Sequence, residues 1–213
     1  MVEGERKTRR LWSTLARSAP YAVGTAELAA TIEPSGDGCA DLLLDARYQC
    51  RPRGPLGALC WRTVGDRPEV DVEAGASVEV AELAPGVWQV RFDPAIESQF
   101  RLRVTSRHVR ALDRTGRDPR PGLPTELAPP VEFLACACAV PVERIEIEVT
   151  APDGWPVADP GVACWVGDWP GYAIDPTERC ASTAVDHAGR SVRLAVEWPI
   201  PGHTFALAWR PGG

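Results

Sequence analysis

The chain of 213 residues is poor in several features that would mark a particular function. Lysine occurs once, as Lys7, and the 23 basic residues are outnumbered by 29 acidic ones, which gives a net charge of -6 at pH 7. A duplex nucleic-acid binder needs a basic face to neutralise phosphates, so this balance argues against a nucleic-acid partner. No stretch approaches the roughly 20 apolar residues of a membrane helix, so we expect no membrane span.

The N-terminus lacks the apolar segment of a secretory signal peptide. Four of the five residues 6–10 are basic, but Ser13, Arg17 and Pro20 interrupt the stretch that follows. The seven cysteines are odd in number and lack the tight spacing of a disulfide scaffold, which indicates reduced thiols in the core. These features predict a cytoplasmic protein. The preference for Arg over Lys, with abundant Ala, Pro and Gly, is typical of a GC-rich bacterial source.

The sequence also lacks the short motifs of the common enzyme classes. It has no Gly-x-Gly-x-x-Gly opening a helix, no Walker-type phosphate loop and no Gly-x-Ser-x-Gly nucleophile elbow. We therefore expect no cofactor, no catalytic residues and no enzyme activity.

What the chain does contain is regular alternation of apolar and polar residues. Between Val192 and Trp198 every second residue is apolar, and the same pattern runs from Phe205 to Trp209 after a Pro-Ile-Pro-Gly break. A period of two indicates strands with one buried face, and a Pro/Gly break between two such strands indicates a hairpin. We predict that this stretch is the closing hairpin of a β-sandwich.

A similar element occurs in the first half of the chain. Four features of the first half recur in the second half at nearly the same separation in sequence. Phe100 matches Phe205 and Leu102 matches Leu207, each 105 residues apart. The motif Gly-x-x-Cys-Trp occurs at 57–61 and 161–165, 104 residues apart, and Gly-Asp-x-Pro occurs at 65–68 and 167–170, 102 residues apart. A period near a hundred residues is too long for a solenoid repeat and indicates a duplicated domain.

The resulting prediction is an all-β protein made of two tandem antiparallel sandwiches of immunoglobulin-like or fibronectin-like general form. A basic leader at residues 1–20, which could form a short helix, precedes domain one at 21–112. A Pro-rich linker at 113–130 joins it to domain two at 131–213. Short strands separated by turn residues at intervals of roughly 8–12 residues support this class of fold.

The cysteines leave one metal-binding alternative open. Cys136 and Cys138 share a face of a predicted strand, and with Cys164 or Cys180 and a histidine they could bind zinc. Structural zinc sites, however, usually use cysteine pairs at turns, spaced C-x₂₋₄-C, and none is present. We therefore predict packing roles for these cysteines and no metal.

One catalytic alternative is a Cys/His hydrolase. Cys180 and His187 lie in the same stretch, with Asp186 beside the histidine. Neighbouring residues of an extended chain point to opposite sides, so Asp186 is poorly placed to orient His187. The sequence favours a non-enzymatic role over this alternative.

The aromatic residues carry the predicted binding site. Trp155, Trp169 and Tyr172 have no aromatic counterpart in the first half and lie beside Pro and Gly in the loops of residues 153–172. Exposed aromatics of this kind are common at interfaces. Trp12 in the basic leader is a further candidate contact for a partner.

Together these features predict a non-catalytic protein-interaction module. The expected role is a cytoplasmic bacterial adaptor or an accessory subunit of a larger assembly, with a protein partner. The second hypothesis is a carbohydrate- or small-ligand-binding sandwich that uses the same aromatics, since sandwiches host many functions.

Overall fold

The computed structural model describes residues 12–14, 17–35, 38–62, 66–74, 76–84, 86–113, 131–167 and 173–211. Most of these residues form β-strands, and the prediction of an all-β fold is confirmed. The strands are β1 (Tyr21–Pro34), β2 (Cys39–Pro52), β3 (Leu56–Arg62), β4 (Asp66–Glu73), β5 (Ser77–Ala84), β6 (Val87–Ile96), β7 (Phe100–Asp113), β8 (Glu132–Ala137), β9 (Val142–Thr150), β10 (Val157–Val166), β11 (Ser182–Ala188), β12 (Ser191–Glu197) and β13 (His203–Pro211).

Helical structure is limited to short segments. Residues 12–14 and 17–18 are helical, as predicted for the leader, and η2 (Pro176–Glu178) is a single 3-10 turn. Among the residues that the structure describes, no helix is long and apolar enough to span a membrane.

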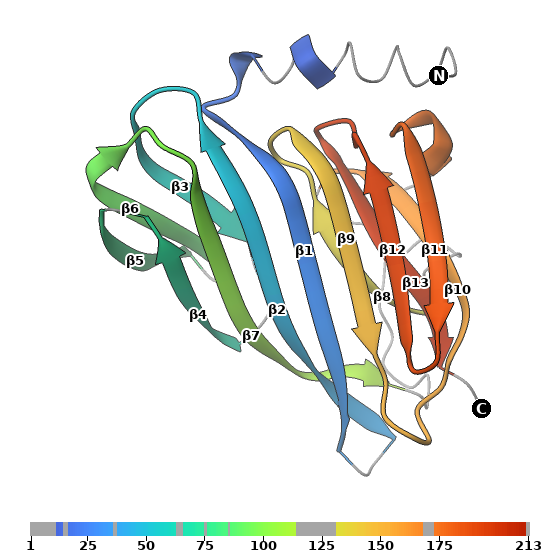
Figure 1. Ribbon diagram of the computed structural model, residues 1–213. Helices are drawn as coiled ribbons and strands as arrows, with labels where there is room; N and C mark the ends of the chain where they lie inside the picture. Colours follow the sequence, from blue (N-terminus) through green and yellow to red (C-terminus); the bar gives the residue numbers. More distant parts are fainter. Residues whose placement is uncertain are drawn as a thin grey trace.

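The strands form one large sheet and two small ones. The large sheet has seven strands in the order β11-β12-β9-β1-β2-β7-β4, and the small sheets have the orders β10-β13-β8 and β3-β6-β5. Figure 1 shows both small sheets behind the large one, with β3, β5 and β6 on the left and β8, β10 and β13 on the right. The strands therefore form two sandwiches that share one long layer.

A parallel strand pair joins the two halves of the chain. β1 from the first half lies beside β9 from the second, with pairs from Val23 and Val142 to Thr31 and Thr150. The other pairs of the large sheet are antiparallel. Residues 114–130 of the predicted linker lie outside the described residues, so the linker and the domain boundaries stay predictions.

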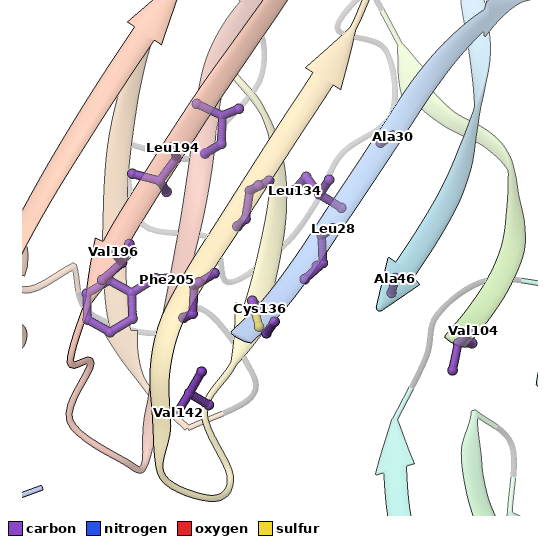
Figure 2. Packing of buried hydrophobic residues seen from close by; sticks show 14 of the residues in the cluster. Leu28, Ala30, Ala46, Val104, Leu134, Cys136, Val142, Leu194, Val196 and Phe205 are labelled. Carbon is purple, nitrogen blue, oxygen red and sulfur yellow. The ribbon is translucent and has the colours of Figure 1, made fainter. Parts of the chain in front are cut away.

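The core lies between the large sheet and the small sheets. Ile145, Ile147 and Val149 of β9 are fully buried, whereas the residues between them face outwards. Buried residues of both halves form one continuous cluster. Figure 2 shows side chains from β1, β8, β9, β12 and β13 meeting there, among them Leu28, Leu134, Val142, Leu194 and Phe205. Because burial of apolar surface drives folding, this shared core couples the stability of the two halves.

The predicted closing hairpin is wrong. β12 lies in the large sheet and β13 in a small sheet, so the turn at residues 198–202 crosses from one layer to the other. Trp198 and Gly202 take left-handed backbone angles within it, with φ of 52° and 84°. The consecutive strands β6 and β7 also belong to different sheets, but in that case the first strand, β6, lies in the small sheet and β7 lies in the large one. Alternation shows which side chains are buried, and not the sheet to which a strand belongs.

Candidate functional site

The outer face of the large sheet, which points away from the small sheets, carries charged residues in ion pairs, some between neighbouring strands and some along one strand. Arg103 of β7 and Arg47 of β2 both bind Asp45, at 2.9 Å and 2.8 Å. Arg107 binds Asp41 at 2.8 Å and also reaches Glu33. Further pairs are Arg144–Glu197, Arg144–Glu146, Arg193–Glu148 and Arg101–Glu73. Exposed pairs of this kind add little stability individually, but they offset one another's charge on this face.

Asp45 is expected to make part of the stability sensitive to acid. Its hydrogen bond from Arg103, supported by Arg47, lowers the pKa of the Asp45 carboxyl below its ordinary value. The stabilisation is therefore present above the unfolded-state pKa of about 3.9 and is lost as the pH falls through the lower folded-state pKa. We expect Asp45→Asn to reduce the free energy of unfolding at neutral pH by up to about 1 kcal/mol.

Urea unfolding of wild type and Asp45→Asn at neutral pH and at about pH 2 tests this prediction, because the two proteins should converge in acid, where Asp45 is protonated. Glu73→Gln is the matched control, since Glu73 is 67 % exposed and has one ion pair, with Arg101 at 3.4 Å. An equal difference between wild type and Asp45→Asn at both pH values would contradict the assignment.

An open groove of about 930 Å³ interrupts this charged face. It crosses β1, β2, β7 and β4 and is lined by Ala29, Thr31, Leu43, Leu44, Asp45, Glu69, Thr105, Ser106, Arg107 and Val109. Thr31 faces Leu43 across the β1–β2 pair, and Thr105 faces Glu69 across the β7–β4 pair. Val109 is 55 % exposed. Uncharged and apolar side chains on an otherwise charged face are a common sign of a binding surface.

The charges at the rim of the groove are not equivalent. The Arg107 guanidinium is compensated by Asp41 and Glu33, and the Asp45 carboxylate is held by two arginines. Glu69, on the edge strand β4, is exposed and has no ion pair with the residues that the structure describes. Among the residues that the structure describes, nothing compensates this negative charge at the β4 end of the groove, which favours a cationic group there.

Beneath the groove, the Ser106 hydroxyl lies 3.2 Å from Nε2 of His108. A serine–histidine contact is the first element of a nucleophile–base pair. Ser106 is only 8 % exposed, however, and both residues lie on the face of β7 that turns towards the core. The contact therefore satisfies two polar groups near the core.

Of the aromatic residues predicted to form the binding site in loops 153–172, the structure describes Trp155, which is buried. Trp155 is 4 % exposed and belongs to the continuous core cluster. Gly154, with φ of 76°, turns the chain, and the Trp155 amide donates to the Pro152 carbonyl at 3.2 Å. Because this turn folds the indole onto the end of the core, Trp155 does not offer an exposed ring, as an aromatic sugar platform requires. Trp169 and Tyr172 lie outside the described residues, and their binding role stays a prediction.

The loop of Trp155 borders a second, smaller hollow of about 510 Å³. Residues 151–157 and the β11–β12 turn line it, with His187 at one side. Arg190 and Asp153, which form an ion pair at 2.5 Å, are among its lining residues, and both side chains are more than half exposed. An exposed pair of this kind is weak and solvated, so this hollow offers less to a ligand than the groove.

Trp12 packs against the fold of its own chain. Its side chain is 6 % exposed, and its indole N–H donates to the Val142 carbonyl at 2.7 Å. Its ring also meets Trp198 edge to face, with centroids 4.8 Å apart. These contacts hold the leader helix against the end of β9, so Trp12 has no exposed ring for a partner. Its predicted binding role is untested.

Six of the seven cysteines are buried thiols, and Cys60 is exposed. Burial raises the pKa of Cys136 and of Cys164 to about 12 and that of Cys180 to about 11. The Cys180 thiol donates to the Pro176 carbonyl at 3.2 Å, whereas His187 is exposed on β11. A protonated thiol is neither a nucleophile nor a metal ligand, which argues against the Cys/His hydrolase. In the part of the chain that the structure describes, no three His, Cys, Asp or Glu side chains are grouped to hold a metal ion.

Comparison with known proteins gives a class of fold and no family. No protein-family model and no curated protein sequence matches the chain. The solved structures that align with it include metallopeptidases and a hydrolase. An M1 zinc metallopeptidase from Deinococcus radiodurans aligns over 90 % of this chain and 42 % of its own, with 18 % identity and a TM-score of 0.48. Native leukotriene A4 hydrolase from Saccharomyces cerevisiae aligns over 98 % of this chain and 33 % of its own, with 14 % identity and a TM-score of 0.46.

These matches overturn the prediction of a non-catalytic protein-interaction adaptor, because the similar structures are enzymes. The chain spans less than half the length of either one. At TM-scores below 0.5 the likeness transfers no site. Any functional residues must therefore be argued from the geometry of this chain.

Proposed function

We propose that this chain is a peptide-holding β-sheet domain of a peptidase-type hydrolase, and that the groove on the large sheet holds an extended segment of the peptide. The observation that carries the proposal is the groove itself, a hollow of about 930 Å³ on a charged face that is lined mostly by uncharged residues. Thr31 and Thr105 supply hydroxyls for hydrogen bonds to a peptide backbone, and Leu43 and Val109 supply apolar surface for its side chains. The proposal assigns the described residues a binding role and no bond-breaking step.

The dimensions of the groove set the length of the segment. It crosses four neighbouring strands. Strands lie about 4.8 Å apart, so three intervals span roughly 14 Å, and an extended chain rises about 3.3 Å per residue. A segment of about four or five residues therefore matches the groove.

The carboxylate of Glu69, which has no ion pair with the described residues, gives the peptide a direction. A peptide amino group is cationic at neutral pH and is attracted to an uncompensated carboxylate. We therefore propose that the amino end of the peptide lies at the β4 side of the groove. We further propose a cytoplasmic location, which the seven free cysteines support.

Binding of fluorescein-labelled pentapeptides, measured by anisotropy, tests the proposal. Ala29→Trp places a large side chain in the groove and is expected to weaken binding at least about tenfold by steric exclusion. Ala195→Trp is the matched control, because Ala195 is also an alanine on the outer face, on β12, outside the groove. Equal binding by wild type and both variants, or no binding by wild type, would contradict the proposal.

The direction of the peptide is tested separately. Glu69→Gln is expected to weaken binding of a peptide with a free amino terminus by about two- to fivefold, the range of an exposed charge pair. The variant should leave binding of the N-acetylated peptide unchanged. Glu73→Gln, on the same strand but paired with Arg101, is the control. A loss of equal size for free and acetylated peptides would contradict the proposed direction.

A further inference from the structure

We propose that two copies of this chain pair through β11 into a dimer with one continuous sheet. β11 is the last strand on one side of the large sheet and pairs with β12 over its seven residues without a register shift. Among the described strands, none pairs with its other side. Six of its seven residues are exposed. A regular, exposed edge presents N–H and C=O groups that a further extended strand can pair with.

The opposite edge of the same sheet is built to prevent such pairing. β4 contains Pro68 and three acidic residues after it, Glu69, Asp71 and Glu73, and its register with β7 shifts between Asp66 and Glu69. Proline, charge and an irregular register all hinder the addition of a strand. β11 reads Ser-Thr-Ala-Val-Asp-His-Ala, with one charged residue and no proline. It is therefore the unprotected edge of the large sheet.

The sequence of β11 is compatible with its own copy. An antiparallel pair of two β11 strands about a two-fold axis at Val185 pairs all seven residues of each strand. In this register the numbers of two residues that face each other add up to 370. Asp186 then faces Ala184 of the partner subunit, so the two carboxylates do not oppose each other. Thr183 faces His187 of the partner subunit, which places a hydroxyl beside an imidazole. Val185, which is 38 % exposed, meets Val185 of the partner subunit. Cross-strand pairs of this kind favour sheet formation.

The size of the contact determines its strength. A single strand pair buries less than the roughly 1,200–2,000 Å² of a stable interface. We therefore expect a dissociation constant on the order of 1–100 µM. At that strength the monomer and the dimer both populate solutions of ordinary laboratory concentration, and the equilibrium can be measured directly.

Sedimentation velocity of the full chain over about 1–500 µM tests the proposal, a range that brackets the expected dissociation constant. Val185→Lys places two like charges opposite each other and is expected to leave only monomer. Val80→Lys is the matched control, because Val80 is 37 % exposed on β5, an edge strand of a small sheet. It should dimerise as wild type does. Far-UV circular dichroism confirms that each variant is folded.

A second variant tests the register of the pair. Ala184→Lys sets a cation opposite Asp186 of the partner subunit and is expected to tighten the dimer about two- to tenfold, since each dimer gains two cross-strand ion pairs. Tightening by Ala184→Lys together with loss of the dimer in Val185→Lys would support the proposal. A wild type that stays monomeric throughout, a dimer lost in Val80→Lys but kept in Val185→Lys, or a dimer lost in Ala184→Lys would overturn it.

Discussion

Ile147→Ala is expected to lower the free energy of unfolding of the whole chain by about 2–5 kcal/mol, the range for removing a fully buried aliphatic side chain. Ile147 is 0 % exposed in β9. It pairs with Leu28 of β1 on one side and with Leu194 of β12 on the other, both of them buried. The lost contacts therefore belong to both halves, and we expect both to unfold in one shifted transition.

Urea unfolding followed by tryptophan fluorescence and by circular dichroism measures this effect. Tryptophan residues lie in both halves, with Trp88 in the first and the buried Trp165 and Trp209 in the second, and circular dichroism also reports strands of both halves. The two signals should give one midpoint, which Ile147→Ala moves to lower urea. Val185→Ala, at an exposed position of the edge strand β11, should change the free energy by less than about 0.5 kcal/mol. Two midpoints, of which only one moves, would mean that the halves are independent domains.

The strands and their buried faces were predictable from the sequence because the alternation is strict. Ile145, Ile147 and Val149 alternate with Glu146 and Glu148, and the structure buries all three apolar residues completely. The same holds for Phe205 and Leu207 of β13. The layer of each strand was not predictable, because a strand in either sheet of a sandwich shows the same alternation. The predicted hairpin at residues 192–209 was wrong for this reason.

The parallel pairing of β1 with β9 also could not be predicted from the sequence. The strands are separated by more than a hundred residues, and no short-range signal links them. β1 is rich in alanine, with Ala22, Ala26 and Ala30 buried, so its apolar pattern is weak. The sequence of β11 does not indicate a strand, because its Ser, Thr, Ala and Asp residues are also common in loops and it gains little from burial. Its place in the sheet comes from its partner β12.

The groove was partly visible in the sequence. Outward positions of β7 read Arg101, Arg103, Thr105, Arg107 and Val109, so the run of charges is broken twice. These interruptions form a groove only because of the strand register, which places Leu43 beside Arg107 and Thr31 beside Leu43. The burial of Trp155 was not predictable, because a loop indole can point to either side of its backbone.

The exposed thiol and the buried thiols should differ strongly in their rates of reaction with a thiol reagent. Six of the seven cysteines are buried and one, Cys60 on β3, is exposed. A buried thiol reacts only when the structure opens, and for a domain stable by about 5 kcal/mol or more global opening slows the reaction at least about a thousandfold. We expect Ellman's reagent to modify one thiol rapidly in the native protein and all seven in denaturant.

Cys60→Ser should abolish the rapid phase and leave the slow one, because the remaining six thiols stay in the core. Cys164→Ser is the matched control, since Cys164 is 0 % exposed and its removal should leave the rapid phase at one thiol. Burial also raises the pKa of Cys180 to about 11, so its thiolate should remain scarce at neutral pH. Rapid modification of Cys180 in the native protein, detected by mass spectrometry of the labelled peptides, would contradict the core packing and restore a reactive role for that thiol.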